Sequence, residues 1–415
     1  MTEPGQPPWS LRARWLFPVE GPPLEGGLIT IAGDRIVSID TRPPRPPDLD
    51  LGNVAVLPGL VNAHTHLDLS GLRGRLPPGV DFTGWLRGVI RHRRSLTPPQ
   101  VEAAIQAGLA ESLAHGTTLI GDIAGQGLSW PLVAAAPLWG VVFYELLGLP
   151  KDRARLAWHA ARTWLRDHPA TATCRPGLSP HAPYSLRASL FRATAAFARR
   201  HHLPVAIHLA ETAAEQELLR RHRGPLRDFL TDLGVWDAAG LIRRPEDLPG
   251  VFADAVPTAF IHGNYLSSNV SIAPGNTVVY CPRTHAAFGH PPHPLPDLLA
   301  AGVRIALGTD SLASNPDLDV LAEARFLHRR YPEIPGLEIL RMATLSGAEA
   351  LGWQQQTGSL RPGKSADLVI LPLENVQATD PHRLILESDL SVRAVLWCGR
   401  WVHGRAAAGS GPIPL

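Results

Sequence analysis

The sequence predicts an α/β protein, a (β/α)8 TIM-like barrel joined to a small β-sandwich domain that is built from both chain termini. Three observations support this prediction. The middle of the 415-residue chain alternates short apolar runs with helical patterns, and both ends read as short strands between turns. No G-x-G-x-x-G follows a strand, which disfavours a doubly wound sheet. The predicted domains are 1–57 and 351–415 for the sandwich and 58–350 for the barrel.

The sandwich is predicted from strand-like segments at the two ends of the chain. Leu28–Ile31 and Arg35–Ile39 flank Gly33-Asp34, a dipeptide position typical of a tight hairpin. The same texture returns in Ala366–Leu371 and Val392–Trp397. One small domain made from both ends is the simplest interpretation.

The barrel is predicted from eight strand-like runs with helical stretches between most of them. Thr97 and Pro98 start a helix as N-cap and first residue, and Gly116 stops it. A second helix is predicted over 151–167, and 223–257 reads as an insertion with its own helix. The eight runs are the one ending at His64 and those at 118–122, 140–144, 172–179, 204–209, 258–263, 277–281 and 303–309.

Composition indicates a soluble cytoplasmic protein. The net charge of +2 gives no reason to expect nucleic acid or an acidic membrane surface as a partner. The three cysteines lie far apart without C-x-x-C spacing, which favours free thiols. No leader pattern is visible, and no apolar run is long enough to span a membrane. A homodimer is one expectation, although the sequence does not fix the oligomer.

His64 and His66 are the most informative residues of the chain. They end the apolar run that follows Pro58-Gly59, and residues two apart on a strand point to the same face. Both imidazoles could therefore reach one cation, whereas on a helix they would lie about 200° apart. The pair alone is a weak indication, because the chain contains 18 histidines.

Three further strand ends carry residues suited to the same cation. Each has a simpler interpretation when taken singly: a hydrogen-bonded polar cap for a histidine, a turn residue for an aspartate. Together with His64 and His66, all at carboxyl ends of barrel strands, they predict a metal site. The residues are His208, with Glu211 three positions on, His262, and Asp310 after Gly308-Thr309.

Imidazole nitrogens with one carboxylate suit one divalent metal, Zn²⁺ first and Fe²⁺ next, with a position left open for water. A metal of this kind lowers the pKa of its water to about 7. Glu211 is then placed to shuttle a proton from water to the substrate. The alternative role of Glu211 is that of an exposed first-turn residue whose charge interacts favourably with the dipole of a helix over 211–222. Asp310 can hold the water and accept its second proton.

These segments resemble the amidohydrolase superfamily. The likeness runs from about residue 28 to 403. It rests on Val61–His66, Ile207–Glu211, Phe260–Gly263, Gly308–Ser311 and Gly358–Val369.

The resemblance implies a mononuclear hydrolase, because the fourth strand-like run holds neither the lysine nor the glutamate of the dinuclear branches. It implies His64, His66, His208 and Asp310 as ligands. It also implies that His262 polarises the attacking hydroxide and that Glu211 protonates a substrate ring.

Substrate contacts are expected from three residues. Ser179–Ser185 resembles the loop of the S-adenosylhomocysteine/methylthioadenosine deaminases in which a histidine contacts substrate, which implies this role for His181; a loop histidine without a role is the alternative. Arg283 could bind an anionic arm through two hydrogen bonds or pair with a nearby acid. Trp85 would add an aromatic wall. His64–Gly74 and Cys281–His285 look closer to the aminodeoxyfutalosine deaminases of menaquinone biosynthesis.

The leading hypothesis is therefore a metal-dependent hydrolytic deaminase of an aminated purine-type ring, with a 5′-modified adenosine such as aminodeoxyfutalosine as substrate. The runner-up is a mononuclear amidohydrolase or chlorohydrolase acting on a cyclic C–N or C–Cl bond. A non-catalytic barrel scaffold is the third hypothesis. The intact set of ligand positions argues against the scaffold.

Overall fold

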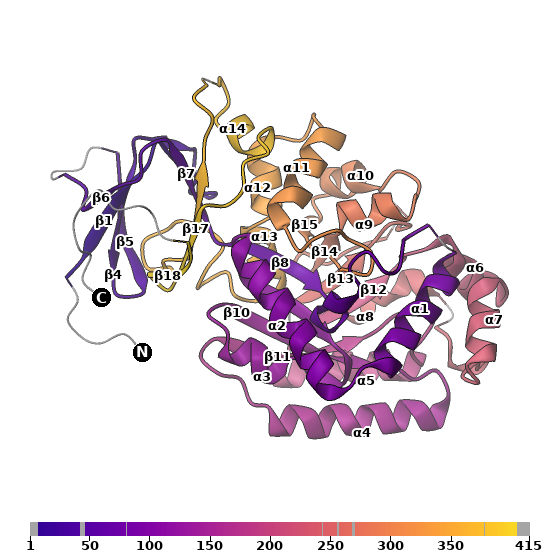
Figure 1. Cartoon of the computed structure of the whole chain (residues 1–415). Coiled ribbons are helices and arrows are strands. Elements are labelled where there is room, and N and C mark those ends of the chain that lie inside the picture. The colour runs from indigo at the N-terminus through magenta and orange to yellow at the C-terminus, as the bar shows by residue number, and fades with distance from the viewer. Residues whose placement is uncertain are drawn as a thin grey trace.

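Eight parallel strands form a nearly closed barrel in the computed structural model, which describes residues 7–41, 46–79, 81–242, 244–254, 257–267, 270–376 and 378–404 (Figure 1). All eight predicted strands are present, in sequence order around the sheet. At the seam the Asp310 N–H donates to the His64 carbonyl oxygen over 3.1 Å. The strands are β8 (Leu60–Thr65), β9 (Thr117–Ala124), β10 (Trp139–Leu146), β11 (Cys174–Pro180), β12 (Val205–Leu209), β13 (Thr258–His262), β14 (Thr277–Tyr280) and β15 (Arg304–Leu307).

Helices surround the barrel (Figure 1). The two helices predicted from the sequence are confirmed as α2 and α4, and the Gln100 side chain accepts a hydrogen bond from the Thr97 N–H at the start of α2. The helices of the barrel are α1 (Phe82–Ser95), α2 (Pro98–Ala114), α3 (Trp130–Ala135), α4 (Lys151–Asp167), α5 (Ala188–His201), α6 (Ala213–Arg221), α7 (Pro225–Asp232), α8 (Leu248–Val251), α9 (Pro282–Ala287), α10 (Leu295–Ala300), α11 (Val320–Arg330), α12 (Gly336–Met342) and α13 (Leu345–Ala350). Short 3₁₀ turns lie at η1 (Leu67–Leu72), η2 (Gly125–Gly127), η3 (Ala238–Gly240) and η4 (Pro245–Asp247).

The interior of the barrel is filled by alternate residues of the strands. Because side chains of a strand point alternately to its two faces, one set faces the lumen and the other faces the helices. Val61, Val141, Phe143, Ala206 and Ile261 belong to the interior set and are fully buried. This apolar plug leaves the carboxyl ends of the strands as the place for polar chemistry.

The insertion over 223–257 contains its own helices, as predicted, and packs beside the carboxyl ends of the strands. Leu226 and Phe229 of α7 share a buried cluster with Tyr184, which follows β11, and with apolar residues of α1. Arg87 of α1 also pairs with Asp232 of α7 over 2.6 Å. The insertion thereby fixes α1 beside the site.

The terminal domain lies beside the barrel and contains two sheets (Figure 1). β7 pairs with β16 in antiparallel register, so the two chain ends share one sheet. Its strands are β1 (Trp9–Arg12), β2 (Trp15–Leu16), β3 (Leu24–Glu25), β4 (Leu28–Ala32), β5 (Arg35–Asp40), β6 (Leu49–Asp50), β7 (Val54–Pro58), β16 (Leu368–Pro372), β17 (Ala394–Trp397) and β18 (Arg400–His403), with α14 at Arg383–Leu386.

Several expectations reach beyond what the structure tests. The division of the chain at residues 57 and 350 stays a prediction, and residues 1–6 and 405–415 of the predicted sandwich lie outside the described residues. The homodimer and the cytoplasmic location also stay predictions. Within the described ranges, none of the helices combines the length and apolar character that crossing a membrane requires.

Candidate metal centre at the barrel mouth

β8 carries a bulge between Asn62 and Thr65, the segment that contains His64. Asn62 pairs with Ile120 of β9 and Thr65 pairs with Asp122, so β8 advances by three residues where β9 advances by two. An extra residue of this kind changes which side chains face the interior. His64 and His66, two residues apart, both face the cluster, and their ring centroids are 5.0 Å apart.

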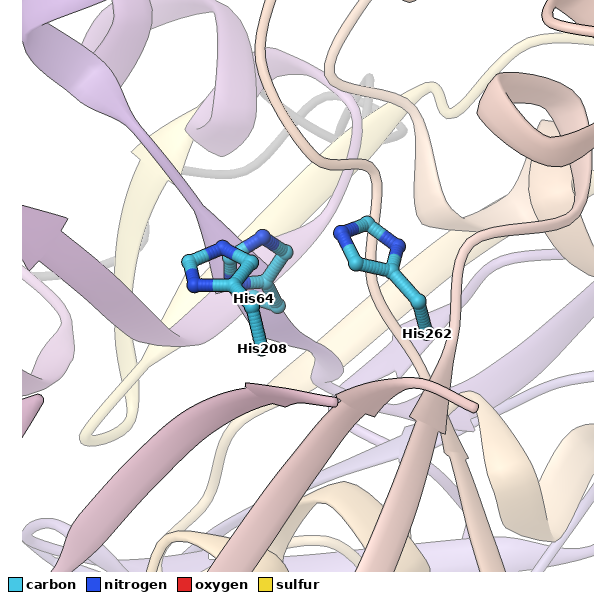
Figure 2. Close-up of side chains that lie close together, drawn as sticks. All are labelled: His64, His208 and His262. Atoms are coloured by element: carbon cyan, nitrogen blue, oxygen red, sulfur yellow. The ribbon is translucent and has the colours of Figure 1, made fainter. Parts of the chain in front are cut away.

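The ends of β12 and β13 and the loop after β15 bring the other predicted site residues to these two histidines. The rings of His64, His208 and His262 face one another above the strand ends (Figure 2), with centroids 5.0 to 5.6 Å apart. Asp310 Oδ1 lies 3.5 Å from His64 Nε2 and 3.8 Å from His66 Nε2. Ligand atoms lie within 4.8 Å of one another in each of two groups, His64–His208–His262 and His64–His66–Asp310.

Left-handed backbone occurs at or just after the ends of β12, β13 and β15. Ala210, His262 and Asp310 have φ angles of 53°, 70° and 59°. Non-glycine residues rarely adopt this conformation, and each such residue costs about 1–3 kcal/mol. Contacts around the site hold it: His293 Nε2 lies 2.9 Å from the His262 carbonyl oxygen, and Thr65 Oγ1 donates to the Asp310 carbonyl oxygen. Strain concentrated at three strand ends is typical of a functional site.

The chemistry of the donor set fits a divalent metal. His64 Nδ1 and His66 Nδ1 are buried without a hydrogen-bond partner among the described residues. Burial, with the neighbouring imidazoles, lowers the pKa of His66 and of His208 well below the ordinary value, which favours their neutral form. Burial would raise the pKa of Asp310, but its hydrogen bond with His64 and its electrostatic interactions with His64, His262 and His66 lower it overall. Neutral imidazoles beside an ionised carboxylate are the states that bind metal.

Neighbouring groups orient two of the expected ligands. His208 Nδ1 lies 3.3 Å from the His181 carbonyl oxygen, so an Nδ1–H donor leaves Nε2 free for a metal. Ser314 Oγ donates to Asp310 Oδ2 over 3.1 Å. Outer contacts of this kind fix both the tautomer and the direction of a ligand.

Glu211 is buried beside the cluster. Its Oε1 lies 3.5 Å from His262 Nε2, and the Asn264 side chain donates to its carbonyl oxygen. Burial raises the pKa of Glu211 well above its usual range, and the carboxylates of Asp310 and Glu215 add to this. The alternative of an exposed first-turn residue is wrong, because α6 begins only at Ala213 and Glu211 is 9% exposed. A buried carboxyl with a raised pKa is a stronger base than an exposed one, which suits it to accept a proton and pass it on.

Glu215 positions Glu211, and the sequence analysis missed it. The Glu215 carboxylate is fully buried, and it accepts hydrogen bonds from the N–H groups of Ala210 and Glu211 over 3.1 and 2.8 Å. The i, i+4 spacing of two glutamates at the start of a helix was the available indication. Burial raises the pKa of Glu215 to about 7, against the effect of the backbone donors.

Glu215→Ala is expected to destabilise the protein by about 3 kcal/mol, because two buried backbone donors lose their acceptor. Thermal unfolding measures the change, and kcat should fall with it because Glu211 is no longer held. Glu217→Ala on the same helix is the matched control, since its carboxylate is half-buried and pairs with exposed Arg223. Equal stability of the two variants would contradict the positioning role.

His181 and Trp85 lie at the mouth, as expected. The His181 ring is 4.8 Å from that of His208 and meets Tyr184 edge-on, while its Nδ1 lies 2.6 Å from Ser185 Oγ. Trp85 stacks on Phe82 and its indole N–H donates to the Ala313 carbonyl oxygen, next to the loop after β15. Their roles as substrate contacts stay predictions.

Arg283 pairs with nearby acids, which is the alternative that the sequence left open for it. Its guanidinium donates to Asp317 and to Glu323, and the Glu323 carboxylate is fully buried. The substrate contact is therefore corrected: two acids, 34 and 40 residues away in the chain, already occupy this arginine.

Arg283→Ala should destabilise the fold by about 3–5 kcal/mol, because it leaves buried Glu323 without its partner charge. Denaturant unfolding checks this. Arg12→Ala is the control, since Arg12 and Asp50 form an exposed pair whose loss should change the stability little. A stable Arg283→Ala protein with an altered substrate preference would restore the anion-binding role.

A sequence comparison identifies the protein family to which this site belongs. The model of the amidohydrolase family matches residues 55–404. The chain belongs to the amidohydrolase family. As a member of this family it is a hydrolase acting on carbon–nitrogen bonds, and the family uses a divalent metal.

Two curated relatives are similar to this protein along most of the chain. The 5-methylthioadenosine/S-adenosylhomocysteine deaminase of Pyrococcus furiosus is 31% identical over 388 residues, which cover 89% of this chain and 84% of that protein. The aminodeoxyfutalosine deaminase of Deinococcus radiodurans is 32% identical over 331 residues, covering 75% and 76%.

Solved structures confirm the amidohydrolase fold. Helicobacter pylori aminofutalosine deaminase in complex with methylthio-coformycin superposes with a TM-score of 0.83 at 23% identity, covering 95% of this chain and all of that one. An adenosine deaminase from Xanthomonas campestris with bound zinc gives a TM-score of 0.77 at 23% identity, covering 97% and 94%.

Proposed function

We propose that this protein is a metal-dependent hydrolytic deaminase of adenosine-like substrates. Water replaces the exocyclic amine of the purine ring, and ammonia leaves. The observation that supports this most is the position of Glu211, whose Oε1 lies 3.5 Å from His262 at the edge of the histidine–aspartate cluster and whose pKa is raised by burial. A metal site and a proton-carrying acid meet there.

The residues that would hold the metal are His64, His66, His208 and Asp310. Zinc is our proposal, and iron(II) is next, because imidazole and carboxylate ligands suit both. When bound, the metal supplies Lewis acidity and makes water a nucleophile at neutral pH.

The side chains of the chain itself then divide the proton transfers. Glu211 Oε1 receives a proton from the attacking water and delivers it to a ring nitrogen of the substrate. His262 Nε2, 3.5 Å from that carboxyl, orients the oxygen that adds to the ring. Asp310 accepts the second proton only transiently, because its pKa is lowered. The released amine takes up that proton and leaves as ammonia.

For the substrate we propose a 6-aminopurine nucleoside with a modified 5′ arm. Aminodeoxyfutalosine, with a place in menaquinone biosynthesis, is our first choice, and S-adenosylhomocysteine or methylthioadenosine is the next. The names of the two curated relatives support this class. The argument from an anionic arm no longer applies, since Arg283 pairs with Asp317 and Glu323.

A kinetic panel tests the proposal. Ammonia release is followed for adenosine, methylthioadenosine, S-adenosylhomocysteine and aminodeoxyfutalosine, and for free adenine, guanine, cytosine and a chlorotriazine. The proposal expects kcat/KM to be higher for at least one nucleoside than for every free base. A free base or triazine that exceeds every nucleoside would contradict it, and chloride release would favour the chlorohydrolase alternative.

A further inference from the structure

An ionic cluster of one half-buried arginine and two buried carboxylates adjoins the candidate metal centre and has no part in the chemistry described so far. Arg93 of α1 donates through Nε to Asp68 Oδ2 over 2.8 Å and through Nη2 to Oδ1 over 3.2 Å. Its remaining terminal nitrogen, Nη1, donates to Glu145 Oε2 over 3.3 Å. The side chain of Asp68 is 10% exposed and that of Glu145 is 4% exposed.

Glu145 points into the barrel near its mouth. It lies one residue before the end of β10, a strand whose pairing with β11 has no register shift. Trp139, Val141 and Phe143 of the same strand belong to the interior cluster, so the two-residue repeat places Glu145 on that face. Residues at this end of barrel strands are the ones that meet substrate.

The charges around Glu145 do not balance. Asp68 takes two of the three contacts that Arg93 makes within the cluster, so the single positive charge faces two carboxylates. Glu145 Oε1 accepts no hydrogen bond from the described residues. It lies 3.9 Å from His181 Nε2, which is too long for a direct hydrogen bond.

This arrangement suits the recognition of hydroxyl groups. A carboxylate whose second oxygen is free accepts hydrogen bonds from an O–H, and an imidazole nitrogen 3.9 Å away offers a second partner to the same group or its neighbour. A ribose presents two vicinal hydroxyls, and acidic side chains bind such hydroxyls in other nucleotide sites. An anionic group would instead meet the excess negative charge.

We propose that Glu145, held by Arg93 and flanked by His181, is a subsite that accepts hydrogen bonds from the vicinal hydroxyls of the substrate's ribose. The subsite selects nucleosides over free purine bases. This inference rests on the proposed function and adds the group that binds the hydroxyls of the sugar.

Adenosine and 2′,3′-dideoxyadenosine test the subsite, because they share the ring and the amine and differ only in the two hydroxyls. For the wild-type enzyme kcat/KM should be roughly 10- to 100-fold higher for adenosine, as expected for hydrogen bonds to a charged group. Glu145→Ala should reduce this ratio to near one. Glu145→Gln, which keeps one acceptor oxygen, should retain part of it. Metal content is measured for each variant and should match the wild type.

Two results would overturn this account, and they are distinguishable. A similar loss of kcat/KM for both nucleosides in Glu145→Ala and Glu145→Gln would mean that Glu145 only supports the mouth, which overturns the subsite. Glu217→Gln, on the exposed side of α6, is the control that should leave the ratio unchanged. A wild-type enzyme that deaminates no nucleoside overturns the proposed function, and the subsite with it.

Discussion

Replacement of His208 by alanine is expected to remove the metal and the activity together. His208 lies at the end of β12 with its ring 5.0 Å from that of His64 and 5.5 Å from that of His66. Without it, three expected ligands remain, and the Lewis acidity that activates water is lost. A metal contributes several kcal/mol to such a transition state, so turnover should fall by roughly 10³-fold or more.

Elemental analysis and ammonia release measure both effects on the same sample. His159→Ala is the control, because His159 is exposed on α4, and it should leave metal content and turnover unchanged. Circular dichroism confirms that the barrel has folded. A His208→Ala enzyme that keeps its full metal content would show that His208 is not a ligand.

The second large effect is expected from Glu211→Gln, which should keep the metal and lose about 10²- to 10⁴-fold in kcat. Glutamine has the shape of glutamate but cannot carry a proton from water to the ring. Because the substituted side chain is not among the expected metal ligands, metal content should equal that of the wild type.

This variant separates chemistry from metal binding. His208→Ala should lose both, whereas Glu211→Gln should lose only turnover. Glu217→Gln on α6 again serves as the control for a glutamate outside the site. Near-normal kcat for Glu211→Gln on the best substrate of the panel would remove Glu211 from its role.

Much of the site could be predicted from local sequence. The strands of the barrel are short apolar runs that end in His64, His208, His262 and near Asp310, so their positions follow from period and punctuation alone. The parallel barrel then brings strand ends together without any knowledge of contacts. The bulge in β8 escaped prediction, because it depends on the register with β9.

The residues that escaped prediction act through partners distant in the chain. Arg283 is neutralised by Asp317 and Glu323, and neither spacing leaves a local pattern. The proposed role of Glu145 depends on its contact with Arg93 of α1, which lies 52 residues earlier in the chain. Tertiary packing determines which acid pairs with an arginine, whereas the local sequence determines where a strand ends.

The terminal domain shows the same division. The hairpin of β4 and β5 was predictable from Gly33-Asp34, since turn chemistry is local. The pairing of β7 with β16 joins segments about 300 residues apart; the sequence suggested one domain built from both ends but did not show which strands pair.

Metal titration of the metal-free enzyme tests the central claim most directly, namely that one metal held by His64, His66, His208 and Asp310 supports deamination. Zinc is added in steps to chelator-treated protein while ammonia release from the best nucleoside is recorded. Turnover should be absent at the start, rise in proportion to zinc, and level off at one equivalent per chain. Activity that persists without metal, or that keeps rising to two equivalents, would contradict the account.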